Sequence, residues 1–479
     1  MFNDGQSARR RCLSFALGLC VLLPHFAVAQ EAEEPRRLSL SDAISMGLTR
    51  SPQIEAAEFA SQKAALVVDE ASWAWTPKLE LSSTWAPMPK VELDSTDEKA
   101  FEDLGEWGFF TKNSVELGLP VFTFFKLSTV EELAEIGLDV ELLKEREARL
   151  KVSYDVARAF YGLQLANAGL VVSKEATGLL ERISREYEKL WSQGDPSVKK
   201  TDRYRIEMAA SSLTLLHNEL EMGRQLAEQG LRLHLELEGE FELPKMRFRP
   251  DEAVLLSLDA VLELARSKRL DLQMLDKAVQ ASELNAKLES LKWWPDIVFG
   301  ARLNQAYSNA VPEVPEETIY AYDPYNSFGF GVALTLQWKL DPVNRYFKVA
   351  EADTELLKLQ QQQQLARSAA ALEVEKLYLE SLNAQQQVDL VQSSRRSAKR
   401  FMTQELVDYE VGGGKVDDVI SGVRGYIEQR SLYLQSLYDF RLSLVRLQLA
   451  TGAESVSELL ASGRIEDYFE SEESEEADE

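Results

Sequence analysis

Four segments of the chain alternate apolar and polar residues with a period of two. They begin near Leu79, Val115, Ile297 and Phe328. Because successive side chains of a strand point to opposite faces, each segment predicts a strand with one apolar face. The segment after Phe328 is the clearest, since its second face carries only small or polar residues.

Proline and polar runs set the expected ends of these strands. Pro87 and Pro89 are expected to end the first strand, because proline cannot donate a ladder hydrogen bond. A polar loop is then expected up to about Lys112. A second loop, rich in Pro and Tyr, is predicted around residues 304–327.

Between the strands, apolar residues recur at the spacing of a helix. Residues 38–75 predict a helix that is kinked or divided at Pro52, and the stretch from Leu258 to Trp294 predicts a second one. No proline occurs between Phe125 and Asp195, so a continuous helix of about 95 Å is expected there, at 1.5 Å per residue. A return helix is predicted from residue 198 to about 237.

The same unit is written twice, at an offset of 218 residues. Pro77 is answered by Pro295, and Gly194 by Gly412. Each unit comprises a helix, two strands and a long helical hairpin, and the second hairpin is expected to turn at residues 412–414. We therefore predict a first repeat over residues 30–245, a second over 246–455, and an acidic, disordered tail over 456–479.

The first 29 residues have the pattern of a secretory signal peptide. A basic run at residues 9–11 precedes an apolar run, Leu13 to Leu23, and a small-residue cleavage site at 27–29. A buried N-terminal helix is the alternative interpretation. Cys12 and Cys20 both lie in this segment, so no disulfide or thiolate metal site is expected after cleavage.

The charge of the chain is strongly acidic. The net charge is −26, and removal of residues 1–29, with three Arg and one Asp, leaves −28. Binding of nucleic acid through a general electrostatic field is excluded at this charge. Part of the excess is local, because residues 466–479 hold nine acids and no base.

Exported strands with one apolar face suggest an outer-membrane barrel. Sheet edges are not tolerated in lipid, and known barrels need about eight strands or more, so four strands must be shared between chains. Twelve strands from three chains, or eight from two, would close. The alternative is a soluble β-sandwich whose apolar faces pack together. The aromatic residues near the strand ends favour the membrane; they are Trp85, Phe122, Phe124, Phe125, Phe328, Phe330 and Trp338.

This order of parts resembles the TolC-like family of outer-membrane efflux proteins. The matching features are the openings at 38–43 and 256–260, the helix-to-strand turns at Pro77 and Pro295, and the strand exits at 120–122 and 340–341. The resemblance spans residues 38 to about 452. It implies a homotrimer with a shared 12-stranded β-barrel in the outer membrane and an α-barrel of long helical hairpins crossing the periplasm. It also implies a periplasmic adaptor and an inner-membrane pump of the RND or ABC type as partners.

The family's hairpin-tip pattern, Tyr-x-x-Gly-x-x-Ser/Thr-x-x-Asp, is present in both copies. The matching residues are Tyr409, Gly412, Lys415 and Asp418 in the second copy, and Gly194, Ser197 and Lys200 in the first. The resemblance implies that Asp418 lines the periplasmic constriction, with Asp417 adding charge. The next acid of the family pattern is Ser421 here, and Lys200 replaces the first-copy acid. As an alternative, Asp418 is simply an acid stabilising a helix N-terminus.

Catalytic chemistry finds no support in the sequence. After the leader only His217 and His234 remain, 17 residues apart, whereas a metal pair on one helix face needs a spacing of four. The run Gly412-Gly413-Gly414-Lys415 is no phosphate loop, because Tyr409 and Val416 occupy positions that need Gly and Ser or Thr. We expect no enzyme and no cofactor. A periplasmic adaptor with a coiled-coil hairpin is the rival function, although the doubled strand pairs argue against it.

Overall fold

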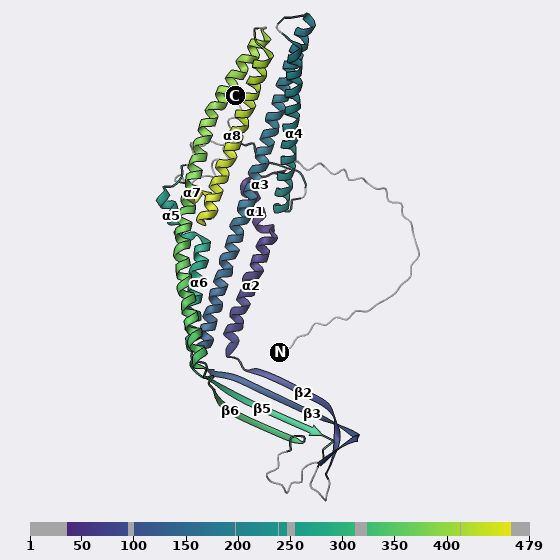
Figure 1. Ribbon diagram of the computed structural model, residues 1–479, viewed down its shortest axis with the longest axis vertical. Coiled ribbons are helices and arrows are strands. Elements are labelled where there is room, and N and C mark those ends of the chain that lie inside the picture. The colour runs from purple at the N-terminus through teal and green to yellow at the C-terminus, as the bar shows by residue number, and fades with distance from the viewer. Residues whose placement is uncertain are drawn as a thin grey trace, which may run out of the picture.

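The molecule is long, with a small sheet at one end and two helical hairpin tips at the other (Figure 1). The structure is a computed structural model that describes residues 36–93, 100–196, 198–237, 239–246, 254–311, 323–411 and 413–460. The predicted signal peptide and most of the predicted acidic tail lie outside these residues.

The helices and strands follow the predicted duplicated order. The first set is α1 (Leu40–Arg50), α2 (Pro52–Ser72), β2 (Lys78–Leu93), β3 (Ala100–Phe122), α3 (Lys126–Gln193) and α4 (Lys200–Leu235). The second set is α5 (Leu258–Lys268), α6 (Leu270–Leu291), β5 (Asp296–Ser308), β6 (Ser327–Gln337), α7 (Pro342–Glu410) and α8 (Val416–Thr451). Short elements complete the description: β1 (Arg36–Arg37), η1 (Trp73–Trp75), β4 (Phe241–Glu242) and η3 (Val456–Leu459).

Both repeats break their first helix at the same place. The break at Ser51 is the one predicted from Pro52, while the prediction of an unbroken helix over residues 258–294 is wrong. Arg269, 218 residues after Ser51, has nearly the same backbone angles, with φ and ψ of −63° and 119° against −69° and 120°. The Arg269 side chain bridges Asp271 and Glu373, so ion pairs on α6 and α7 hold a break that has no proline.

The prediction that Pro87 and Pro89 end the first strand is also wrong. β2 continues through both to Leu93, β3 already begins at Ala100, and the ladder shifts register only after Pro89. β2 lies at the edge of its sheet, where a residue without an N–H is tolerated because one side of the strand makes no ladder bonds. β5 likewise extends to Ser308, into the predicted loop.

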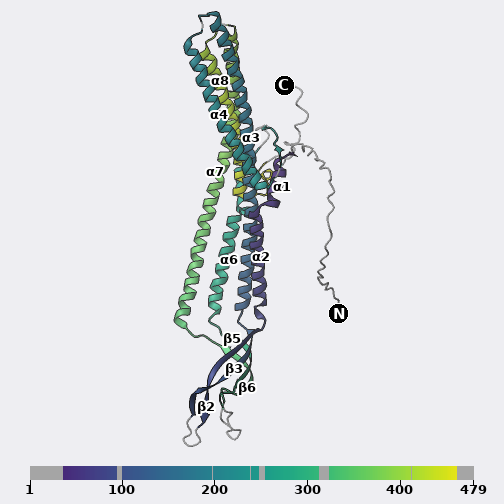
Figure 2. The same cartoon turned by 90° about the vertical axis from the view of Figure 1, so that its right-hand side faces the viewer.

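The long helices stack side by side above the sheet. Near the strands the order across the chain is α2, α3, α6, α7 (Figures 1 and 2). At 68 and 69 residues, α3 and α7 each extend for about 100 Å. Further from the sheet, α4 and α8 return along α3 and α7 and bury the apolar residues that lock the hairpins together.

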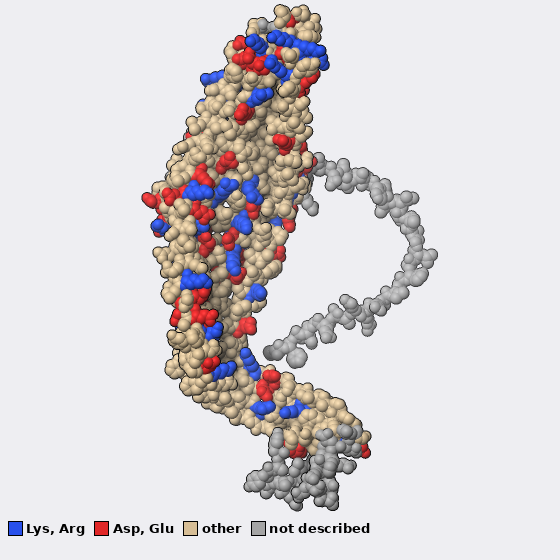
Figure 3. Space-filling model, in the orientation of Figure 1, with Lys and Arg blue, Asp and Glu red and all other residues tan. Residues whose placement is uncertain are grey.

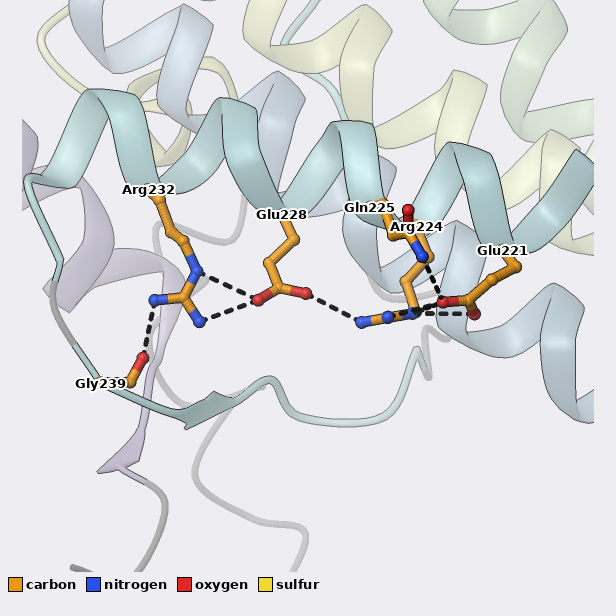
Figure 4. Close-up of polar contacts among 6 residues, drawn as sticks. All are labelled: Glu221, Arg224, Gln225, Glu228, Arg232 and Gly239. Atoms are coloured by element: carbon orange, nitrogen blue, oxygen red, sulfur yellow. Dashed lines mark hydrogen bonds and ion pairs between the residues drawn. The ribbon is translucent and has the colours of Figure 1, made fainter.

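A row of ion pairs fastens the end of α4 to the segment that follows it (Figure 4). Arg224 binds Glu221 at 2.7 Å and Glu228 at 2.8 Å, and Arg232 binds Glu228 at 2.8 Å. Arg232 also donates to the carbonyl oxygen of Gly239 at 2.7 Å. The row therefore holds the turn that leads into β4, which pairs with β1 and positions α1.

Candidate functional site

The sheet has one continuous apolar face. Its four strands are antiparallel in the order β2-β3-β5-β6, and directly paired residues share a face. Pairing therefore aligns the apolar positions of all four strands; they are Leu79, Leu81, Val115, Leu117, Leu119, Ile297, Phe299, Ala301, Leu303, Phe330, Val332, Leu334 and Leu336.

Nothing in the described part of the chain covers this face. Phe330 is 70% exposed, Leu334 69% and Leu81 71%, and none of the three hydrophobic core clusters includes an apolar residue of these strands. An exposed apolar surface of this kind marks contact with a membrane or another protein. The alternative of a self-packed soluble sandwich is not what the chain forms, because all four strands lie in one sheet.

Both edges of this sheet are open. β2 and β6 are each hydrogen-bonded to one neighbour only, among the residues that the structure describes. Unpaired backbone N–H and C=O groups cost several kcal/mol each in lipid, so an open edge there must be closed by another strand.

The opposite face of the sheet is polar and contains small residues. Arg302 pairs with Glu116 across the strands at 3.1 Å, and Ser82 and Ser114 share a hydrogen bond of 2.7 Å. On β6 this face carries Gly329, Gly331, Ala333 and Thr335. Such a face suits a water-filled interior.

Aromatic side chains cluster where the strands meet the helices. Phe124 stacks on Trp294 with ring centres 5.4 Å apart, Phe122 packs edge-on against Phe124, and the Trp338 indole donates to the Trp293 carbonyl at 3.0 Å. These residues include three of those that the sequence predicted for an interfacial girdle. Aromatic belts of this kind lie at the boundary between lipid and water.

The strand-to-helix corner is backbone-strained. Phe124 and Phe125 have φ of 49° and 66°, in the left-handed region that residues other than glycine rarely adopt. Ring packing against Phe122 and Trp294 accompanies this conformation. The corner redirects the chain from β3 into α3, between the sheet and the long helices (Figure 1).

The other candidate site is the pair of hairpin tips. Gly194 ends α3 with φ of 74°, and its N–H donates to the Trp191 carbonyl at 3.1 Å. In the second hairpin, the N–H groups of Gly413 and Gly414 both donate to the Asp408 carbonyl at 2.9 Å. Ser197 and Gly412, also predicted as tip residues, lie outside the described residues.

The predicted constriction residues lie at the starts of the two return helices. Lys200 is the first residue of α4, and Asp417 and Asp418 are in the first turn of α8. All three are exposed, and only Asp417 is brought into an ion pair, with the Arg205 guanidinium at 3.5 Å. Arg205 also approaches Asp202 at 3.3 Å, and the Asp202 carboxylate caps α4 by accepting from the Lys199 N–H at 2.8 Å.

Sequence reasoning missed the residues that join the two tips. Arg205 of α4 reaches Asp417 of α8, and no local motif marks that long-range pair. Tyr187 stacks on Trp191 and its hydroxyl donates to the Lys199 carbonyl at 3.3 Å. Tyr409 was noted only as part of the tip pattern, yet it is 2% exposed and burial, with the nearby Glu186 carboxylate, raises its pKa to about 12.

The tip of α3 and α4 gathers Lys and Arg side chains (Figure 3). The described residues contain no group of three or more His, Cys, Asp or Glu side chains able to hold a metal ion. Among the same residues, no helix is both long and apolar enough to cross a membrane.

Residues 261–453 match the family of outer membrane efflux proteins. The search of curated proteins found no match. The fold is similar to three solved channels. They are CmeC of Campylobacter jejuni (TM-score 0.67, 15% identity, 88% of each chain), VceC of Vibrio cholerae (0.67, 14%, 86% of this chain and 96% of that one) and the open state of MtrE of Neisseria gonorrhoeae (0.64, 15%, 86% and 88%).

At these identities the solved structures show a common fold, and the family match carries the identity of the chain. The protein is accordingly a channel of the outer membrane that extends into the periplasm, and its family consists of transport channels with no enzymatic activity. The resemblance predicted from the sequence is confirmed: this chain is an outer-membrane efflux protein of the TolC-like type.

Proposed function

We propose that three copies of this chain form a passive exit duct through the outer membrane. The observation that carries this proposal is the four-stranded sheet, which has an uncovered apolar face and two open edges. Joining β6 of one copy to β2 of the next, three times over, closes a barrel of twelve strands with the apolar face in lipid. The small and paired polar groups then line the interior.

The same closure brings two helices together. β6 leads into α7 and α2 leads into β2, so joining these edges places α7 of one copy beside α2 of the next. Each of these helices carries exposed apolar residues seven positions apart. They are Phe59, Leu66 and Trp73 on α2, and Leu365, Leu372 and Leu379 on α7. A seven-residue repeat is the spacing at which helices pack along a coiled-coil seam, which supports the proposed pairing.

The duct itself supplies no energy in this proposal. An inner-membrane pump of the RND or ABC type provides it, and a periplasmic adaptor links the pump to the hairpin tips. The cargo is small molecules or, in a type I secretion system, polypeptides. The long helices, about 100 Å each, give the length needed to reach across the periplasm.

We also propose that the hairpin tips gate the duct. Gly194, Ser197 and Gly412 supply the turns, and Asp418, with Asp417 and Lys200 nearby, faces the constriction. The Arg205–Asp417 ion pair ties α4 to α8, so its loss would loosen the tip. Conductance of Asp418→Ala in a planar bilayer tests the constriction: unchanged cation selectivity would remove Asp418 from this role.

Fractionation tests the duct. The proposal predicts a heat-modifiable trimer that stays with outer membranes when they are washed without detergent. A periplasmic adaptor, the rival function, would be released by the same wash. Recovery of the chain as a water-soluble monomer would contradict the proposal, because the open sheet edges would then have no partner.

A further inference from the structure

A basic patch lies on α7 near the second hairpin tip. Arg396, Lys399 and Arg400 line an open groove of about 470 Å³ together with Thr403, Gln404 and Val407. All six residues are exposed. They follow one another at intervals of three or four positions, so they share one side of the helix.

The three cations of the basic patch have no ion pair or side-chain hydrogen bond with any residue that the structure describes. Other arginines at the same level are paired, Arg182 with Glu410 at 3.0 Å and Arg430 with Glu175. The adjacent Arg395 turns away and lies over the Tyr433 ring, 4.5 Å from its centre. Three unpaired cations in a chain of net charge −26 point to an acidic partner that completes the patch.

The chain itself carries a suitable acidic segment, residues 461–479. It contains nine Asp and Glu residues and one Arg, a net charge of −8 over 19 residues. It begins directly after Leu460, which is buried in the same hydrophobic cluster as Ala384 and Val388 of α7. The acidic segment is therefore tethered to the helix that carries the basic patch.

The tether is long enough to reach the patch. Lys399 lies eleven residues beyond Val388 on α7, which corresponds to about 17 Å along the helix. A chain of 19 residues spans up to about 63 Å when extended. Tethering also keeps the effective concentration of the acidic segment at the patch high, so modest attraction is enough for occupancy.

We propose that residues 461–479 fold back onto the basic patch of the same chain and cover it. Carboxylates of the segment pair with Arg396, Lys399 and Arg400, and an acidic partner or anionic cargo reaches the groove only by displacing them. This proposal is independent of barrel closure and of the gate.

Cross-linking in intact outer membranes tests the contact. Residues 30–479 contain no cysteine, so Thr403→Cys with Ser474→Cys places one thiol in the groove and one in the acidic segment. Ser368→Cys with Ser474→Cys is the matched control. Ser368 is also exposed on α7, its hydroxyl also bonds the carbonyl four residues earlier, and it lies on the opposite side of Val388 within reach of the tether.

With a short bismaleimide, we expect Thr403→Cys to cross-link within one chain at least about threefold faster than Ser368→Cys, since three exposed ion pairs give roughly threefold to hundredfold in occupancy. The preference should vanish in 1 M salt, where the Debye length falls to about 3 Å. It should also vanish when Arg396, Lys399 and Arg400 are all changed to Gln.

A second triple variant separates the patch from general charge. Changing Lys348, Lys358 and Arg367 to Gln removes the same charge from α7, but these three are paired with Glu351, Glu355 and Asp276. This control should keep the Thr403 preference. Equal rates at positions 403 and 368, a preference that survives the first triple variant, or cross-links between chains would each overturn the proposal.

Discussion

An arginine placed on either face of β6 distinguishes lipid contact from water contact. Val332 is the middle residue of β6, lies on the apolar face opposite Ala301, and is 58% exposed in the single chain. The neighbouring Ala333 points to the polar face, opposite Gly300. Val332→Arg and Ala333→Arg therefore add the same side chain one residue apart, to opposite surfaces.

The magnitude follows from the length of the strand. Eleven residues at about 3.3 Å extend for about 36 Å, and a tilt of about 40° leaves a height of about 28 Å. That height matches the apolar band of outer-membrane barrels, about 25 Å, and places Val332 near its middle. Arginine at this depth costs about 2–4 kcal/mol, or about 6–12 kcal/mol for three copies.

The assay is folding of the purified chain into lipid vesicles, followed by urea titration and by the yield of heat-modifiable trimer. Val332→Arg should lower the free energy of unfolding by about 2–4 kcal/mol per chain, and Ala333→Arg by less than about 1 kcal/mol. If the apolar face is in water, both variants change stability by about 0.5 kcal/mol or less. Equal losses for the two variants would therefore refute the assignment of that face to lipid.

Three further predictions concern the tips and α4. Arg205→Ala should raise the open probability in a planar bilayer about two- to fivefold, because exposed ion pairs contribute up to about 1 kcal/mol; an unchanged open probability would remove the Asp417 pair from the gate. Gly414→Ala should destabilise the tip by about 1–3 kcal/mol, since its Cβ would lie 2.8 Å from backbone, and faster hydrogen exchange there would show it; Gly413→Ala, with 3.7 Å, should not. The hydrogen bond from the adjacent arginine lowers the Glu221 pKa from 4.5 to about 2, so its contribution to stability is present above pH 4.5 and lost as pH falls towards 2; Glu221→Gln should abolish that dependence in acid unfolding.

The sequence predicted the parts of the fold that repeat or alternate. Period-two alternation located all four strands, and the 218-residue offset placed the two hairpins, because both patterns are set by which side chains are buried or exposed. Strand ends were predicted less well. Pro87 and Pro89 end a central strand, but β2 is an edge strand, and its place in the sheet depends on residues more than 200 positions away.

The break at Arg269 and the tip contacts could not be predicted in this way. Arg269 takes the conformation of Ser51 without a following proline, and its ion pair with Glu373 joins residues 104 positions apart. The same holds for Arg205 and Asp417, which meet only because the two hairpins pack side by side. Such pairs leave no local pattern, since charged residues are abundant throughout the chain.

Disulfide cross-linking between the sheet edges tests the central claim most directly. Within one chain β2 and β6 are separated by three strand spacings of about 4.8 Å, or about 14 Å, which is too far for a disulfide. A panel that pairs cysteine at Ser82 or Thr84 of β2 with cysteine at Gly331 or Ala333 of β6 therefore reports only contacts between copies. We predict covalent dimers and trimers from outer membranes for at least one pair in the panel. If every pair stays monomeric under oxidation while the chain remains folded, the edges do not meet, and the shared barrel is contradicted.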